Sequence, residues 1–290
     1  KQLHTFSIGL KNSKWNEFDY SDFVANKLGT KHHKIIFSKK DFVCLLPKVI
    51  YHLDDPIVHP NTVPMYILAK EARKYTKVLL TGEGADEIFY GYNRYFQKNK
   101  KEGIIYLNAF NNPQDIAKIF KGRISIVNRK KIIRDSNGLK REDKESLYDV
   151  YTYLPHVMLR QDKSGMAANV ENRVPFLYTP VVEIGFNSKT KIGKFGGKTQ
   201  VKRIALKYLP QNLVLRRKCG FGLPISKWLR DEDGLLPHLS DLSKSKVIKK
   251  FFNIDEIKQL IKEHLTEEVD NSSILFTLIS LSIWYNTFID

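Results

Sequence analysis

Hydrophobic positions divide the first part of the chain into short strands and helices. The segment His4-Thr5-Phe6-Ser7-Ile8-Gly9-Leu10 predicts a strand, and His32 to Phe37 predicts a second one. Between them, apolar residues at helical spacing from Tyr20 to Leu28 predict a helix that Gly29 would end as a C-cap. The chain therefore begins strand, helix, strand, which is the order of a parallel βαβ unit.

The following residues continue this pattern. Asp41 to His52 and Val63 to Tyr75 each predict a helix, and a proline- and aspartate-rich loop separates them. Val78 to Thr81 predicts a buried strand that enters a glycine-punctuated turn, and a further helix is expected after that turn. We expect an α/β fold in which a parallel sheet has helices on its flanks.

The hydrophobic pattern changes after Tyr95, because the segments that follow have helical rather than strand periodicity. We place a boundary there, with an α/β nucleotide-binding part at 1–95 and a mainly helical part at 96–290 that completes the site. Near the end, the apolar run from Ile274 to Trp284 is too short to cross a bilayer. It predicts a buried C-terminal helix.

The turn after the third strand carries the first candidate chemistry. Its sequence, Thr81-Gly82-Glu83-Gly84-Ala85-Asp86-Glu87, combines backbone amides with three carboxylates at a strand-to-helix junction. Such a junction can bind an anion, and the carboxylates offer hard oxygen ligands for Mg²⁺. A capped helix with acidic residues in its first turn would have the same pattern, so both interpretations stay open at this point.

The charge of the chain suggests a class of binding partner but does not identify one. The formal net charge of +17 favours an anionic partner such as a nucleotide, RNA, a membrane surface or an acidic domain. A generally lysine-rich protein would carry the same excess without any partner. The two cysteines, Cys44 and Cys219, form neither a metal-ligand spacing nor a disulfide framework, so we expect a reducing, cytoplasmic location.

Two later segments also carry chemistry. Charges alternate in sign from Leu159 to Leu177, which predicts a helix and loop partly buried through ion pairs such as Glu171 with Arg173 or Lys163. A second segment, Gly196-Gly197-Lys198-Thr199 and onward to Gly222, places glycines before a lysine. Glycine lets the backbone and the ammonium group approach a phosphate, although the Walker A spacing is absent.

Taken together, these motifs resemble the synthetase domain of glutamine-dependent asparagine synthetases. That domain belongs to the PP-loop ATP pyrophosphatase group, which also includes β-lactam synthetase. The matches span Thr81 to Tyr92, Gly165 to Tyr178 and Gly197 to Trp228. Thr81, Gly165, Tyr178 and Lys202 depart from the family patterns. The resemblance implies an adenine nucleotide alpha hydrolase-like fold.

The resemblance also implies a reaction. ATP would adenylate the side-chain carboxylate of aspartate and release pyrophosphate, and ammonia from glutamine would displace AMP to give asparagine. By this resemblance, Glu83 would govern the β-aspartyl-AMP intermediate, Lys198 would stabilise charge on the α-phosphate, and Asp86 would bind Mg²⁺. The adenylate would contact the residues Ile8, Thr81, Gly82 and Gly84.

Two family features have no counterpart in the sequence. One is the S-G-G-x-D-S loop after the first strand of the fold, and the other is the N-terminal glutaminase domain. We therefore expect this chain to be an inactive piece of a longer enzyme. In the whole enzyme a further strand would lie between the strands formed by Thr5–Gly9 and Val78–Thr81. A homodimer is possible for this class, and neither a membrane nor a nucleic acid is an expected partner.

Three alternatives remain at this stage. A related amidotransferase could adenylate another carboxylate in an antibiotic or surface-sugar pathway, with substrate choice in the loop from Asp54 to Asn61, which includes His59. A PP-loop tRNA-modifying protein would use the basic charge, and a salt titration of RNA binding would reveal it. The third alternative is a non-catalytic remnant.

Overall fold

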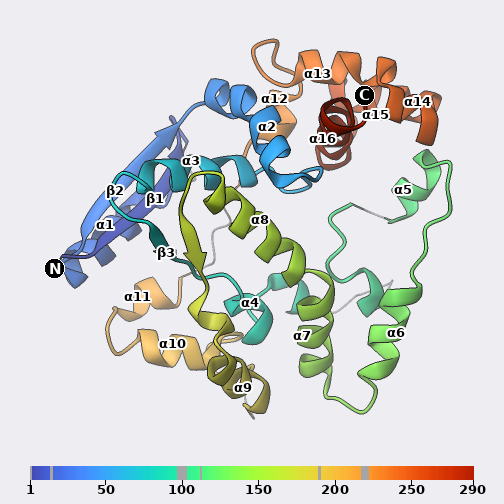
Figure 1. Ribbon diagram of the computed structural model, residues 1–290. Coiled ribbons are helices and arrows are strands. Elements are labelled where there is room, and N and C mark those ends of the chain that lie inside the picture. The colour runs from blue at the N-terminus through green and yellow to red at the C-terminus, as the bar shows by residue number, and fades with distance from the viewer. Residues whose placement is uncertain (1, 14–15, 97–102, 112, 189–190, 217–221) are drawn as a thin grey trace.

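The computed structural model describes residues 2–13, 16–96, 103–111, 113–188, 191–216 and 222–290. It is a mixed α/β structure, mostly helical, with two small parallel sheets (Figure 1). The two chain ends lie on opposite sides of the view in Figure 1. The predicted α/β fold class is confirmed.

The first sheet consists of two strands joined by one helix. Strand β1 (His4–Leu10) pairs in parallel with β2 (Lys31–Phe37), so that Ile8 lies opposite Ile35. Helix α1 (Phe18–Leu28) connects them and ends at Gly29, whose φ of 65° lies in the left-handed region. Both strands, the helix and its C-cap confirm the sequence predictions.

Two helices lead from this sheet to the second one. Helix α2 (Lys39–Leu53) begins with a capping box between Ser38 and Asp41, and α3 (Thr62–Ala72) follows after the predicted loop. Strand β3 (Val78–Leu80) comes next, as expected, but the prediction that it is buried is wrong, because Val78 and Leu80 are exposed. Helix α3 packs against β1 and β2 and against α8 (Leu154–Met166), and α8 in turn packs against the second sheet at Glu171–Arg173.

The partner of β3 was not predicted. Strand β4 (Glu171–Arg173) pairs with β3 in parallel, with Leu79 opposite Asn172. The sequence Glu-Asn-Arg has no apolar alternation, so its pattern predicts a loop. Glu171 and Arg173 do form an ion pair of 2.9 Å, but both side chains are mostly exposed, and the expected partial burial of this pair is wrong. The β3–β4 pair joins residues on both sides of the boundary proposed near 95.

The two sheets are separate in the described part of the chain. There, β1 pairs with β2 and β3 pairs with β4, and no pairing links β1 to β3. A cavity of about 170 Å³ lies between Ile8 of β1 and Leu79 of β3. Side chains from α3 and α8 also line it. Leu80 at the end of β3 is 72% exposed.

The main core lies where the C-terminal helices meet α2. The Phe42 ring of α2 contacts Trp228 and Phe276, at centroid distances of 5.0 and 6.3 Å. Helix α16 (Ser272–Phe288) carries the predicted buried apolar run, and six of its residues are buried. None of the described helices is long and apolar enough to cross a membrane.

The remaining helices occupy the lower, right-hand and upper parts of Figure 1. They are α4 (Ala85–Ile88), α5 (Pro113–Ile119), α6 (Val127–Asp135), α7 (Arg141–Thr152), α9 (Thr179–Asn187), α10 (Thr199–Ala205), α11 (Gln211–Val214), α12 (Ile225–Trp228), α13 (Leu236–Asp241), α14 (Lys246–Phe251) and α15 (Ile254–Leu265).

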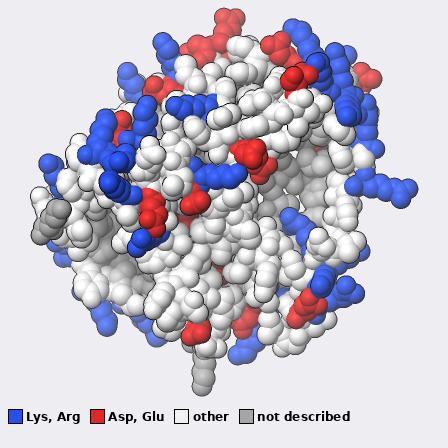
Figure 2. All heavy atoms as spheres, viewed as in Figure 1, with Lys and Arg blue, Asp and Glu red and all other residues white. Residues whose placement is uncertain are grey.

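The excess positive charge does not form one continuous surface in the view that Figure 2 provides. Lys and Arg side chains gather at several places around the edge of this face, and acidic side chains are interspersed among them. Many of the basic residues are paired locally, for example Lys34 with Asp22 and Lys244 with Asp241, both at 2.8 Å. The visible face therefore has no single basic patch of the kind that predicts a nucleic-acid interface.

Candidate active site

The turn after β3 is present, but the helix beyond it is shorter than expected. Gly84 has a φ of 86°, and α4 runs for a single turn from Ala85 to Ile88. Tyr90 then adopts a φ of 61°, which ends the helical backbone. One turn aligns few peptide dipoles, so the helix-dipole part of the predicted anion site is not supported.

The three carboxylates of this turn have three different partners. The Asp86 Oδ1 atom lies 3.0 Å from Nζ of Lys198, and the Glu83 Oε1 atom lies 3.9 Å from a guanidinium nitrogen of Arg160. Glu87 is buried and accepts a hydrogen bond of 2.6 Å from the Tyr92 hydroxyl. Burial raises the pKa of the Glu87 carboxyl above its usual range.

Because the three carboxylates point to different partners, they cannot bind one metal ion together. Among the described residues no group of three His, Cys, Asp or Glu side chains could hold an ion. Mg²⁺ often uses one or two carboxylates together with substrate phosphates and water. Asp86 is partly exposed, but its Oδ1 atom already pairs with the Lys198 ammonium, so a metal ion at this carboxylate would compete with that lysine.

Lys198 is held by its backbone as well as by Asp86. Its φ of 58° places it at the N-cap of α10, and its amide donates to the Phe89 carbonyl at 2.8 Å. The preceding Gly197 passes so close to the Tyr90 carbonyl oxygen that a Cβ would lie 1.9 Å from that oxygen. Glycine is therefore required here for close approach of two backbone segments.

Arg160 is a buried cation beside Glu83. Its guanidinium donates to the Asn61 side-chain oxygen at 2.7 Å, and its Nε atom is buried without a hydrogen-bond partner. Only 6% of Arg160 is exposed. A buried guanidinium with free donor capacity and one distant carboxylate can accept a further anion.

A large cavity lies between the first sheet and the segment that carries Lys198. It has a volume of about 650 Å³ and is lined mainly by β1, α1, α10 and α11. Apolar side chains such as Val24 and Leu209 form most of its wall, with Lys198 and Lys202 on one side. A cavity of this size with mainly apolar walls suits a small-molecule ligand, although the Lys202 ammonium donates to the Phe195 carbonyl and that of Lys198 pairs with Asp86.

Ile8 lines both the large cavity and the 170 Å³ cavity between the sheets. The smaller cavity is also lined by Thr81 and Glu83, and two buried hydroxyls there, those of Thr81 and Ser164, have no hydrogen-bond partner. Buried polar atoms without partners are costly, so these hydroxyls indicate a place where a polar ligand or another backbone segment fits.

The structure brings most of the predicted residues together. Ile8, Thr81 and Glu83 share the smaller cavity, Ile8 and Lys198 share the larger one, and Asp86 contacts Lys198. Gly82 is exposed with open space around its Cα, whereas Gly84 packs against the Leu177 side chain. Residues 217–221 of the third motif, which include Cys219, lie outside the described residues.

Sequence reasoning missed one neighbour of the site. Asn61 accepts a hydrogen bond from Arg160, a contact that was not predicted, although the loop from Asp54 to Asn61 was expected to govern substrate choice. Lys163, considered earlier as a partner of Glu171, instead donates to the Leu53 carbonyl. The available signal for Asn61 was its position in a loop between two helices, where binding groups often occur.

Comparisons with known proteins were consistent with this geometry. The family model described as "Asparagine synthase" matches residues 1–286. Asparagine synthetase (glutamine-hydrolyzing) 1 of Bacillus subtilis is 27% identical over 335 residues, which cover 98% of this chain and 52% of that protein. Asparagine synthetase (glutamine-hydrolyzing) 2 of Oryza sativa subsp. japonica is 29% identical, covering 90% of this chain and 40% of the relative.

A shorter match has higher identity. Asparagine synthetase (glutamine-hydrolyzing) 3 of Arabidopsis thaliana is 41% identical over 106 residues, or 35% of this chain and 18% of that protein. The chain spans about half the length of the first curated relatives that it matches.

Proposed function

Because the chain belongs to the asparagine synthase family, we propose that it forms the ATP-dependent part of an asparagine-forming enzyme. In this reaction the aspartate side-chain carboxylate attacks the α-phosphorus of ATP, and pyrophosphate leaves. Ammonia then attacks the β-aspartyl-AMP carbonyl, and AMP leaves as asparagine forms. The observation that carries the proposal is the contact between Asp86 and Lys198, because Lys198 also lines the 650 Å³ cavity.

The first step joins two anions, so cations must offset their repulsion. Lys198 and Lys202 line the nucleotide-sized cavity, and we assign Lys198 to the α-phosphate. Arg160 lies beside Glu83, and we assign it to a carboxylate of the amino-acid substrate. Its unpartnered Nε and its burial support this role.

Glu83 would act on the second step. Its side chain lines the cavity that Ile8 and Thr81 also line, which would place it beside the acyl-adenylate. A carboxylate there can accept a proton from the attacking ammonia, while the surrounding apolar walls limit hydrolysis of the adenylate. Mg²⁺ bound at Asp86 would neutralise phosphate charge and favour departure of pyrophosphate.

The active enzyme would also need a further strand between β1 and β3. These strands are not paired with each other in the described residues, and the cavity between them contains two unpartnered buried hydroxyls. We propose that this strand and a phosphate-binding loop complete the site in the whole enzyme. The glutaminase activity in the names of the relatives would supply ammonia from a separate domain.

Aspartate-dependent formation of AMP and pyrophosphate by the intact enzyme tests this function. We expect Glu83→Ala and Lys198→Ala to lower turnover by about 100-fold or more, as loss of a charge-stabilising group typically does. Glu71→Ala and Lys74→Ala are matched controls, because these residues form an exposed ion pair on and just after α3. Activity with another carboxylate but not aspartate would favour the related amidotransferase. Equal turnover in all four variants would overturn the site assignment.

A further inference from the structure

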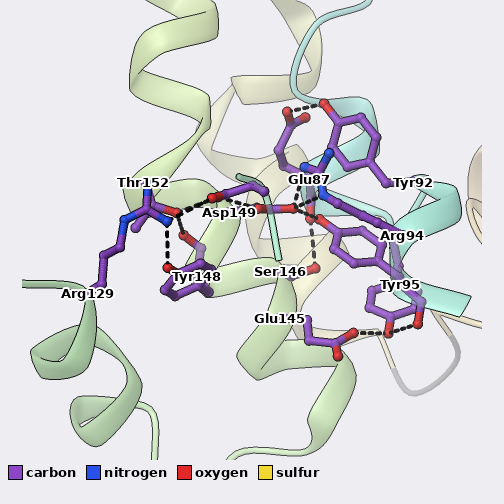
Figure 3. Close-up of polar contacts among 12 residues, drawn as sticks. Glu87, Tyr92, Arg94, Tyr95, Arg129, Glu145, Ser146, Tyr148, Asp149 and Thr152 are labelled. Atoms are coloured by element: carbon purple, nitrogen blue, oxygen red, sulfur yellow. Dashed lines mark hydrogen bonds and ion pairs between the residues drawn. The ribbon is translucent and has the colours of Figure 1, made fainter. Parts of the chain in front are cut away.

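Helix α7 lies against both segments that carry the Asp86–Lys198 pair. On the acidic segment, the Ser146 hydroxyl donates to the Glu87 carbonyl at 2.7 Å. Figure 3 shows this contact together with the side chains of Glu145 and Asp149, which extend from the same helix toward residues 87–95. All three α7 residues are buried. The helix therefore contacts the turn from a face that water does not reach.

Asp149 fixes the end of the acidic segment. Its fully buried carboxylate accepts hydrogen bonds from the Arg94 guanidinium at 2.7 Å, the Tyr95 hydroxyl at 2.5 Å and the Asn108 amide at 2.8 Å. The Arg94 guanidinium also lies 3.7 Å from the centroid of the Tyr92 ring. Tyr92 in turn donates to Glu87, so the network reaches the residue next to Asp86.

Glu145 reaches the lysine segment through Tyr90. The buried Tyr90 hydroxyl donates to Glu145, and the Tyr90 ring stacks on Tyr95 at a centroid distance of 4.2 Å. The Tyr90 carbonyl is the atom against which Gly197 packs. A shift of Tyr90 would therefore move Gly197 and the adjoining Lys198.

A second contact holds the lysine segment to the same helix. Lys191 is buried, and its Nζ lies 2.8 Å from the Asp143 carboxylate at the start of α7. Its ammonium also lies 4.2 Å from the Phe186 ring centroid. Helix α7 thus contacts the chain on both sides of the ion pair, seven residues before Lys198 and next to Asp86.

We propose that Glu145, acting through Tyr90, is a positioning residue that sets the separation between Asp86 and Lys198. Glu145 touches neither of them, and its effect passes through the Tyr90 backbone to Gly197. The inference rests on the proposed function only for its kinetic consequence, because the positioning of Lys198 can be measured without any reaction.

The test uses Tyr90→Phe, which removes the hydroxyl and keeps the ring that stacks on Tyr95. Labelling of lysine amines followed by mass spectrometry reports how accessible Lys198 is, with the exposed Lys40 as internal reference. We expect labelling of Lys198 to rise about fivefold, the factor that corresponds to the net value of one hydrogen bond. Turnover at saturating ATP should fall by a similar factor, with little change in KM for ATP.

Tyr148→Phe is the matched control. It removes a buried hydroxyl of α7 that donates to the Ile105 carbonyl and accepts from Arg129, and that contacts neither Asp86 nor Lys198. It should lower stability comparably and leave both Lys198 labelling and turnover unchanged. Glu145→Leu removes the acceptor while leaving Tyr90 intact, and Glu145→Gln, which retains an acceptor oxygen, should restore labelling toward the wild-type rate.

The outcomes separate the two proposals. Unchanged Lys198 labelling in both Tyr90→Phe and Glu145→Leu would overturn the positioning role. Equal increases in Tyr148→Phe and Tyr90→Phe would also overturn it, because general loosening of α7 would then explain the result. Increased labelling only in the Tyr90 and Glu145 variants would support it, even if the intact protein made no pyrophosphate from aspartate and ATP.

Discussion

The side chains of Asp86 and Lys198 form their ion pair against the Cα of Gly91. A Cβ at Gly91 would lie 2.2 Å from Oδ1 of Asp86 and 2.2 Å from Cε of Lys198, so the ion pair occupies the space that any side chain at 91 would need. Gly91 therefore allows the acidic turn and the lysine segment to come together. The two nearest atoms belong to side chains, which can move, while the third, the Asp86 Cα at 3.0 Å, is backbone and would have to shift by only a few tenths of an ångström.

Gly91→Ala should therefore separate the charged groups more than it disturbs the fold. Since the ion pair is partly exposed, its loss should change the free energy of unfolding by less than about 1 kcal/mol. Adenylation should fall by about tenfold or more if the lysine is displaced from the α-phosphate. Urea denaturation and pyrophosphate formation on one preparation measure both quantities. Full activity in this variant would contradict a role for the pair.

Gly197→Ala should instead lower the stability of the fold strongly. Its Cβ would meet a backbone oxygen at 1.9 Å, and backbone cannot yield as a side-chain end can. We expect the free energy of unfolding to fall by ~1–3 kcal/mol, as for other overpacked sites. Gly222→Ala serves as the control, because no atom lies within 4 Å of its added Cβ. Equal stability of the two variants would contradict the close approach to Tyr90.

Gly82→Ala separates binding from folding. No atom lies within 4 Å of the added Cβ, so the free energy of unfolding should change by no more than about 0.5 kcal/mol. If the adenylate contacts this backbone, as the family resemblance implies, the methyl group would occupy ligand space. The KM for ATP should then rise by about tenfold, a loss of roughly 1.4 kcal/mol in binding. An unchanged KM would place the adenylate elsewhere.

Local sequence patterns predicted those helices and strands that have a regular spacing of apolar residues. Strand β1 and helix α1 carry their apolar faces in local alternation and period, and Gly29 ends the helix through its own backbone preference. Strand β4 lacks such a pattern, because pairing with β3 rather than side-chain burial makes Glu171–Arg173 a strand. Helix α4 ends early since Tyr90 takes a left-handed conformation that packs it beneath Gly197.

In the candidate site, too, contiguous features were predictable from the sequence and contacts between distant segments were not. The turn with Glu83 and Asp86 was recognisable because its residues are contiguous and their types suit phosphate chemistry. The contact of Asp86 with Lys198 and that of Arg160 with Asn61 join segments far apart in sequence. Their existence depends on the packing of α7 and α8, which no local pattern encodes.

His59 provides a prediction about pH. Its ring lies among Phe110, Tyr153 and His156, at centroid distances of 4.7, 5.7 and 5.4 Å. Burial, helped by the positive charge of Arg160, lowers the pKa of His59 from 6.5 to about 3. Below pH 6.5 the His59 ring is therefore protonated in the unfolded chain but stays neutral in the folded protein.

The sign of the effect follows from this difference in proton binding. Between pH 6.5 and about 3 the unfolded state binds more protons at this position, so the stability contributed by neutral His59 is lost as pH falls through that window. The slope from one such group is at most about 1.4 kcal/mol per pH unit. His59→Phe keeps an aromatic ring among the same neighbours and cannot titrate. Its free energy of unfolding should therefore decline less steeply than that of the wild type between pH 6.5 and 4.5 in urea titrations. Parallel pH profiles for the two proteins would show that His59 is protonated in the folded state or is open to water.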